Sequence, residues 1–346
     1  MPSPTPPGPL RAARWTLAAL LGVAVAAGGG AALAQSDPIA AARTEGRVVV
    51  YGSLESPIFD VVQKLYEDKY HIPVDYFRAS TNRLLDRVLT EVRAGRPQFD
   101  VVLTNLGPMQ ILKKEGAFAP YTSPSYGAFP ATSHDPDEVL SPPYRMVVIS
   151  IVYNTRLVGT AEAPRTLADL LDPKWKGKVV LPDPTQHVTT ALWLANLEDL
   201  LGAQYRPFVE RLASQAVLVD SFDPAMQKIA AGEFPIAITY VKYVYIMGKE
   251  GAPLDYVRLT PVLAEAHHVA LGARSAHPAA ARLFIDLFTS RLGLRALAEA
   301  GEFVLAPGIY PPLADADRLT VRPMRELDEQ QLKRWRDEFG RYFRGK

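Results

Sequence analysis

Hydrophobic and polar positions along the first part of this chain alternate between short apolar runs and longer helical patterns. The run RVVVYGS, from residue 47, predicts a buried strand, and the segment from Ser56 places Val61, Val62 and Leu65 on one helical face. The same pair of patterns returns in PVDYFRA with STNRLLDRVLTEVRAG, and in FDVVLT with GPMQILKKEG. This β-α-β-α-β order predicts a mostly parallel sheet covered by helices.

A proline-rich connection separates this unit from a second, similar one. Residues 118–143 contain six prolines, which are incompatible with a helix or a central strand. The long apolar run YRMVVISIVYN follows and is long enough to leave one lobe and enter another. Further on, the runs LDYVRLTPV and HHVALG predict a return to the first lobe, and the carboxy-terminal segment LDEQQLKRWRDEFGRYFR predicts an amphipathic helix against a lobe surface. The chain is therefore expected to form two α/β lobes with a cleft.

The amino terminus has the pattern of an export signal. Two arginines precede an apolar run that ends in Ala32-Leu33-Ala34, the small-x-small pattern cleaved by signal peptidase. We expect residues 1–34 to be a signal peptide cleaved near Ala34, which gives a periplasmic protein that starts near Gln35. An uncleaved anchor is the alternative, because Trp15 to Ala34 is about long enough to span a bilayer.

Composition narrows the possible classes of protein. The 346 residues are 48% hydrophobic, which is enough for two globular lobes with real cores. There is no cysteine, so the chain has no lipid-anchor cysteine, disulfide, thiol nucleophile or thiolate metal site. The net charge is +1 without a basic run, and this makes nucleic acid an unlikely class of partner.

Candidate ligand contacts follow the predicted strands. In open α/β sheets, ligands bind beyond the carboxyl ends of the strands, where helix starts offer free N–H groups. The residues at these places are small or neutral hydrogen-bonding groups: Ser53, Ser80, Thr81, Asn105, Thr185, Gln186, Ser221, Tyr240 and Tyr243. Helix capping alone is an alternative explanation for several of the hydroxyl residues.

Signatures of catalysis and of cofactor binding are missing from the sequence. There is no GxGxxG, GxxxxGK[ST], HExxH or GxSxG, so we expect neither enzyme activity nor a cofactor. His267 and His268 are neighbours on a predicted strand and point to opposite faces, which disfavours a shared metal. A hydrolase or lyase that uses His187 and Asp183 is the alternative from another class of protein.

Several segments resemble the extracellular solute-binding proteins of ferric-iron and phosphonate-type ABC importers. They are EGRVVVYGSLE, STNRLLDRVLTEVRAGRPQFDVVLTN, PRTLADLLDPKWKGKVVLPDP, GEFPIAI and AHPAAARLFIDLFTS, and the resemblance extends to about residue 313. It implies a type II periplasmic-binding-protein fold, with two lobes joined by two crossing strands, and delivery of a ligand to an ABC permease in the inner membrane. We expect residues 35–145 and 260–346 in lobe 1, residues 146–259 in lobe 2, and a hinge near residues 144–153 and 256–263.

The resemblance leaves the choice of ligand open between iron and an organic anion. Iron-binding members often carry a histidine where this chain has Glu55, a glutamate where it has Asn105, and adjacent tyrosines where it has TYVKYVY. If iron binds, its ligands are expected to be Glu55, Tyr240 and Tyr243. Ferric iron needs anionic oxygen ligands, so this set disfavours it.

The anion-binding side of the family pattern matches this chain better. Hydroxyl residues lie at two predicted helix starts, near Thr81 and Thr185, and Arg78 could add positive charge. If Tyr240 begins a helix, it lies about 60° from Tyr243 on one face, with Tyr245 on the other side and packed in the lobe. We therefore expect a monomeric subunit that closes on a small organic or oxyanionic solute, although a periplasmic sensor subunit would use the same binding physics.

Overall fold

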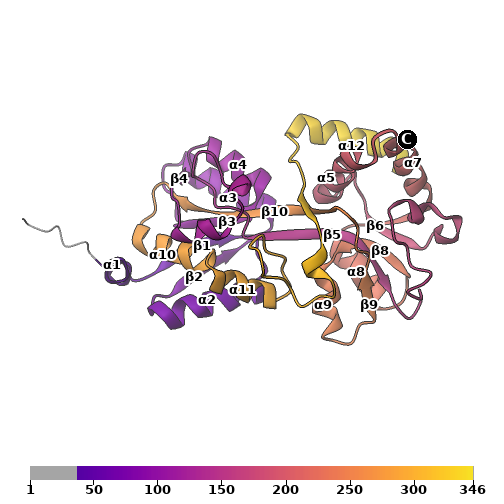
Figure 1. Cartoon of the computed structure of the whole chain (residues 1–346). Coiled ribbons are helices and arrows are strands. Elements are labelled where there is room, and N and C mark those ends of the chain that lie inside the picture. Colours follow the sequence, from indigo (N-terminus) through magenta and orange to yellow (C-terminus); the bar gives the residue numbers. More distant parts are fainter. Residues whose placement is uncertain (1–36, 346) are drawn as a thin grey trace, which may run out of the picture. The chain divides into compact units, whose positions relative to one another are not determined.

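The computed structural model describes residues 37–345, and Figure 1 shows the arrangement of their helices and strands. The predicted signal peptide and its cleavage site lie outside the described residues. Within residues 37–345, no helix is both long and apolar enough to cross a membrane.

The strands of the described chain form one continuous mixed sheet. Their order is β2-β1-β3-β10-β5-β8-β6-β7, with β4 and β11 beside β10 and with β9 beside β5. The strands are β1 (Val48–Gly52), β2 (Val74–Arg78), β3 (Val101–Asn105), β4 (Phe118–Ala119), β5 (Arg145–Asn154), β6 (Val179–Pro182), β7 (Ala216–Val219), β8 (Ile236–Tyr240), β9 (Leu254–Tyr256), β10 (Val262–Gly272) and β11 (Val321–Pro323).

Helices flank both ends of this sheet. They are α1 (Pro38–Glu45), α2 (Ser56–Tyr70), α3 (Thr81–Arg93), α4 (Leu106–Lys114), α5 (Val188–Asn196), α6 (Glu198–Leu201), α7 (Tyr205–Gln215), α8 (Phe222–Ala230), α9 (Lys242–Gly248), α10 (Pro278–Phe288), α11 (Arg291–Glu299) and α12 (Glu329–Phe343). We call the part around β2-β1-β3 the first lobe and the part around β8-β6-β7 the second lobe.

Two long strands join the lobes. β1 pairs in parallel with β2 and β3, and β6 pairs in parallel with β7 and β8, so each lobe contains a parallel part of the sheet. Between them, β10 is antiparallel to β3 and to β5, and β5 is antiparallel to β8. Figure 1 shows β5 and β10 running side by side from one lobe to the other, which confirms the predicted two-lobed fold with two crossing strands.

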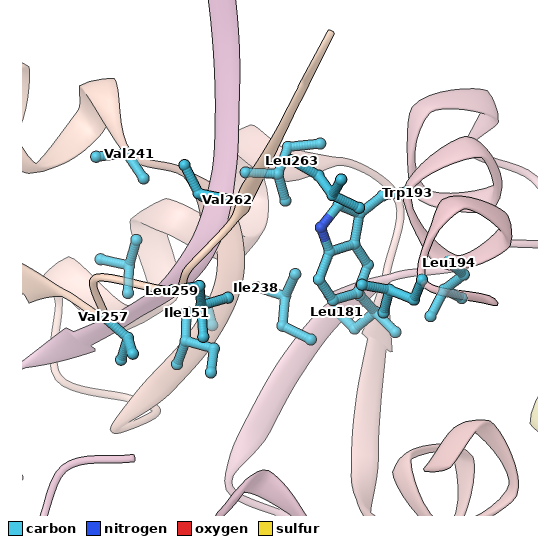
Figure 2. Packing of buried hydrophobic residues seen from close by; sticks show 14 of the residues in the cluster. Ile151, Leu181, Trp193, Leu194, Ile238, Val241, Val257, Leu259, Val262 and Leu263 are labelled. Atoms are coloured by element: carbon cyan, nitrogen blue, oxygen red, sulfur yellow. The ribbon is translucent and has the colours of Figure 1, made fainter. Parts of the chain in front are cut away.

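Apolar periodicity explains how each lobe is built. Every residue of β5 and β10 is buried, as expected for central strands covered on both faces. The core of the second lobe is centred on Trp193 of α5, which is 1% exposed. Figure 2 shows its indole near Leu181, Ile238 and Leu263.

The carboxy-terminal helix packs on the second lobe. α12 contacts α5 and α7, and its Trp335 and Phe339 belong to the same apolar core as Trp193. The rings of Tyr205 and Trp335 lie 5.7 Å apart. β11 runs beside the start of β10, and the chain continues from it to the second lobe. The expected placement of residues 260–346 in the first lobe therefore does not hold for α12.

Candidate functional site

A hollow of about 870 Å³ lies between the two lobes. Its first-lobe wall comes from the loop after β1 and from α2 and α11, and its second-lobe wall from α8, the end of β8 and α9. Three of the residues predicted to bind ligand, Ser221, Tyr240 and Tyr243, line it together with Glu55 and the unpredicted Lys242. The carboxyl ends of strands from both lobes therefore meet at this place, as the sheet geometry predicts.

Two tyrosine rings and a lysine form the floor of the hollow. Tyr240 is the last residue of β8, and its ring centroid lies 4.3 Å from Phe222 and 5.8 Å from Tyr243. Lys242, the first residue of α9, places its Nζ 5.8 Å from the Tyr240 ring centroid and 5.9 Å from that of Tyr243. A cation at this range is attracted by both ring faces.

The expected role of Tyr245 is wrong. Helical spacing counted from Tyr240 turns this side chain away from the ligand, but Tyr245 also lines the hollow. The reason is local: Tyr240 still belongs to β8 and α9 begins only at Lys242, so the angle per residue changes between them.

Lys242 belongs to a group of four charges, which we call the ion quartet: Glu55, Arg145, Lys242 and Glu302. Lys242 Nζ lies 2.8 Å from Glu55 Oε1 and 3.1 Å from Glu302 Oε1. Arg145, at the start of β5, places Nη1 3.1 Å from Glu55 Oε2 and 2.9 Å from Glu302 Oε1. Two cations are thus matched by two carboxylates, and buried charges need such pairing to avoid a large desolvation cost.

The four members of the quartet differ in exposure. The side chains of Arg145, Lys242 and Glu302 are 4%, 5% and 1% exposed, whereas that of Glu55 is 40% exposed and faces the hollow. Burial alone would raise the pKa of Glu55, but Arg145 and Lys242 outweigh it and hold this pKa well below its usual range. Glu55 is therefore a carboxylate at every physiological pH.

The two floor tyrosines are held as neutral phenols. Burial raises the pKa of Tyr240 well above its usual range, and the nearby carboxylates of Glu265 and Glu55 add to this effect. Burial also raises the pKa of Tyr243, whose hydroxyl donates a short hydrogen bond to Asp223. Both tyrosines therefore resist deprotonation to a phenolate.

In the first lobe, the predicted hydroxyls and amide form a chain of hydrogen bonds. Ser53 Oγ lies 2.7 Å from Thr104 Oγ1, and Thr104 and Thr81 donate to Asn105 Oδ1 at 3.0 and 3.2 Å. Asn105 Nδ2 then donates to Glu265 on β10 at 3.0 Å. The structure therefore brings Ser53, Thr81 and Asn105 together, but none of them lines the hollow.

The two predicted serines at helix starts make no cap bond. Ser80 precedes α3 and Ser221 precedes α8, and neither side chain accepts a hydrogen bond from its own helix. Capping therefore does not account for these two residues. Ser80 is exposed outside the hollow, whereas Ser221 lines it.

Thr185 and Gln186 lie elsewhere. The Thr185 hydroxyl donates to Asp183 at 2.7 Å, and both Thr185 and Gln186 line a separate surface hollow against α12. Arg336 of α12 donates to the Gln186 carbonyl at 2.9 Å. These two residues, which the sequence alone places in the cleft, therefore face α12 at the surface of the second lobe.

The side chains of the alternative catalytic pair, His187 and Asp183, are engaged with different partners. His187 Nδ1 lies 3.1 Å from Thr190 Oγ1 and accepts from the Thr190 N–H, so it caps α5. Asp183 is held by Thr185 and Arg344. Burial lowers the pKa of His187, so the ring is neutral in the wall of the hollow.

Sequence reasoning missed three members of the ion quartet. Lys242 could have been found, because it stands between the tyrosines directly after a predicted strand. Arg145 interrupts the start of an apolar run, which is a weaker signal of a buried charge. Glu302 lies in the turn after α11, and nothing in the sequence distinguishes it from a solvated glutamate.

Comparisons with known proteins identify the family to which this chain belongs. The model of the bacterial extracellular solute-binding protein family matches residues 97–333. The chain belongs to this family. It is 26% identical over 230 residues to a probable periplasmic-binding protein of an ABC transporter, y4fP from Sinorhizobium fredii, and this match covers 63% of the chain and 62% of the relative. The match to the family model confirms the predicted family, and the relative supports a binding protein that works with an ABC permease.

Solved structures with two lobes share the fold. Iron-bound HitA from Pseudomonas aeruginosa aligns with 85% of this chain and 99% of its own, at 18% identity and a TM-score of 0.68. AfuA from Actinobacillus pleuropneumoniae, with fructose-6-phosphate bound, aligns with 87% of this chain and 97% of its own, at 21% identity and a TM-score of 0.66. These similarities support the fold. The ligand of this chain has to be inferred from the residues of its own site.

Proposed function

We propose that this protein captures a small organic or oxyanionic solute in the hollow between its lobes and hands it to the permease of an ABC importer. The observation that carries the proposal is the ammonium of Lys242, which lies beside the rings of Tyr240 and Tyr243 and shares the carboxylate of Glu55 with Arg145. A cation on an aromatic floor suits an acid group attached to an organic body. The hydroxyl of Ser221 and the neutral phenols supply further hydrogen bonds.

Closure of the lobes would trap the solute. Contacts to both lobes exist together only in the closed state, so binding favours closure in proportion to that difference in affinity. We place the hinge in β5, near residues 144–153, and in the segment that leads into β10, near residues 256–263. The lobes would contain residues 35–145 and 260–312, and residues 146–259 with 313–346, because α12 packs with the second group.

Ferric iron is the second candidate, because Glu55, Tyr240 and Tyr243 line the same hollow. Several observations weigh against it. Glu55 is already bound by Lys242 and Arg145, and both tyrosines are stabilised as phenols. The ammonium of Lys242 also lies beside both rings and would repel a trivalent cation bound there. Adding ferric citrate should give no visible tyrosinate-to-iron absorption, and a strong band at saturating iron would establish the iron alternative.

We further propose that the protein is exported, cleaved near Ala34, monomeric and without catalytic activity. The engagement of His187 and Asp183 with separate partners supports the last point. Mass spectrometry of the secreted protein should give a chain that starts near Gln35. Mass spectrometry of a bound solute after incubation should return it unchanged.

A thermal-shift screen of the mature protein tests the ligand class. The panel contains phosphonates, sugar phosphates, carboxylates, polyamines and ferric chelates. A true ligand at 100 times its dissociation constant stabilises the folded state by about 2.7 kcal/mol and raises the midpoint accordingly. We expect hits among the anionic compounds, whereas hits among cationic amines alone would overturn the proposal.

A further inference from the structure

We propose that Glu55 is a built-in counter-anion, which the acid group of the solute displaces from Lys242 and Arg145. The inference rests on the proposed function and narrows it to solutes that carry a compact acid group such as a carboxylate, phosphate or phosphonate. It concerns the ligand-free state, in which the cations of the site are already occupied by the protein's own carboxylate.

The two carboxylates of the ion quartet hold the same cations in different ways. Glu302 is 1% exposed and uses one oxygen, Oε1, for both Lys242 and Arg145. Glu55 uses two oxygens, Oε1 for Lys242 and Oε2 for Arg145, in the bridging manner of a bound carboxylate or phosphate. Glu302 is therefore the permanent counter-ion, and Glu55 occupies the place of a ligand.

The charge balance of the quartet requires the acid group of the solute to replace the Glu55 carboxylate, because an anion added beside it would gain little. With both carboxylates in place the quartet is neutral, so a solute anion gains little by approaching it. Without Glu55, two cations that are at most 5% exposed share one carboxylate, and the excess positive charge is costly unless another anion replaces it. An acid group that takes the place of Glu55 restores neutrality.

The position of Glu55 also allows its carboxylate to move away from Lys242 and Arg145. It lies in the loop after β1, its side chain is 40% exposed, and it faces the hollow. It is the N-cap residue of α2, but its side chain makes no cap hydrogen bond there. Once displaced, the carboxylate can turn to water, close to the positive end of the α2 dipole, which favours a negative charge.

The exchange has a consequence for selectivity. The apparent affinity for a solute is its intrinsic affinity reduced by the competition from Glu55, so neutral isosteres and weakly charged solutes are rejected. Removing the carboxylate of Glu55 should relax this requirement and tighten the binding of simple anions.

The test compares Glu55→Gln with wild type and with Asp60→Asn. Asp60 is an exposed acid on α2 outside the hollow, so its substitution makes the same charge change on the same helix. The probe is inorganic phosphate, titrated at constant ionic strength while the thermal midpoint is recorded. We expect Glu55→Gln to bind phosphate on the order of tenfold more tightly than wild type, equivalent to about 1.4 kcal/mol, and Asp60→Asn to behave as wild type.

A second variant confirms the place of binding. Lys242→Met in the Glu55→Gln background should abolish the added phosphate response, with circular dichroism as the check of folding. The inference is overturned if Glu55→Gln responds to phosphate no more than Asp60→Asn, or if it responds less than wild type. The proposed function itself would be contradicted by a different result, namely that no anionic compound of the thermal-shift panel binds the wild-type protein.

Discussion

Replacing Glu326 with glutamine is expected to stabilise the protein increasingly as the pH rises above 4.5 and to leave its stability unchanged below that pH. Glu326 follows β11, where Asn196 holds the neighbouring Arg325 backbone through bonds of 2.7 and 3.0 Å. The Glu326 carboxylate lies against the start of α4, so close that a Cβ on Gly107 would be 2.8 Å from its Oε2. Burial and the neighbouring Glu265 raise the pKa of Glu326 from 4.5 to about 8.

The sign of the effect follows from proton binding. Between pH 4.5 and 8 the folded chain keeps a proton on Glu326 that the unfolded chain has lost. The free energy of unfolding therefore falls by about 1.4 kcal/mol per pH unit in this window, and by at most about 5 kcal/mol in total. Glutamine is neutral at every pH, so the variant does not lose this stability.

Urea denaturation followed by tryptophan fluorescence at pH 4, 6, 7 and 9 measures the difference. The variant should equal wild type at pH 4 and exceed it by a growing margin up to pH 9. Glu162→Gln, which changes an exposed acid, should follow wild type at every pH. A constant difference between Glu326→Gln and wild type, or one that shrinks as the pH rises, would refute the reasoning.

Other substitutions test the packing and the site. Trp193→Ala should cost about 3–5 kcal/mol in urea denaturation, because the indole fills the second-lobe core, and a loss below about 1 kcal/mol would contradict that packing. Gly293→Ala should destabilise by about 1–3 kcal/mol, since its Cβ would lie 2.3 Å from the Leu287 carbonyl oxygen. Gly340→Ala, in an open part of α12, should gain about 0.5–1 kcal/mol, and the same sign for both glycine variants would be inconsistent with the structure. Tyr240→Phe or Tyr243→Phe should weaken solute binding without changing the melting temperature, and unchanged affinity in both would place the binding site elsewhere.

The strands and helices of this protein follow from local pattern. Apolar runs bounded by helix starts predict β1 and β3, because buried parallel strands need continuous apolar residues and their helices need one apolar face. The passage between lobes also follows from the sequence, since a run as long and apolar as YRMVVISIVYN exceeds one ordinary strand. The local sequence pattern does not show on which surface of the protein an amphipathic helix packs. The sequence of α12 shows an apolar face but not the lobe on which it packs, and in the structure this face lies against α5 and α7.

The candidate site was predictable only in part, for a related reason. Tyr240 ends β8, and Tyr243 and Ser221 lie shortly after the ends of strands, which is a local signal. Pairing among Glu55, Arg145, Lys242 and Glu302 joins positions up to 247 residues apart, and their charges become informative only once the chain brings them together. Thr185 carries the same local signal as Ser221, but its loop faces α12 and not the hollow between the lobes, which is a property of the tertiary structure.

Titration calorimetry with the best anionic compound of the panel tests the central claim most directly. The wild-type protein is compared with Lys242→Met and with Lys178→Met, a control that removes an exposed lysine distant in sequence from the site. Circular dichroism checks the folding of each protein. The account predicts that Lys242→Met loses at least about tenfold in affinity, which corresponds to about 1.4 kcal/mol, while Lys178→Met binds as wild type. Equal affinities for all three proteins, with the solute bound, would show that the ammonium of Lys242 does not hold the solute and would contradict the account.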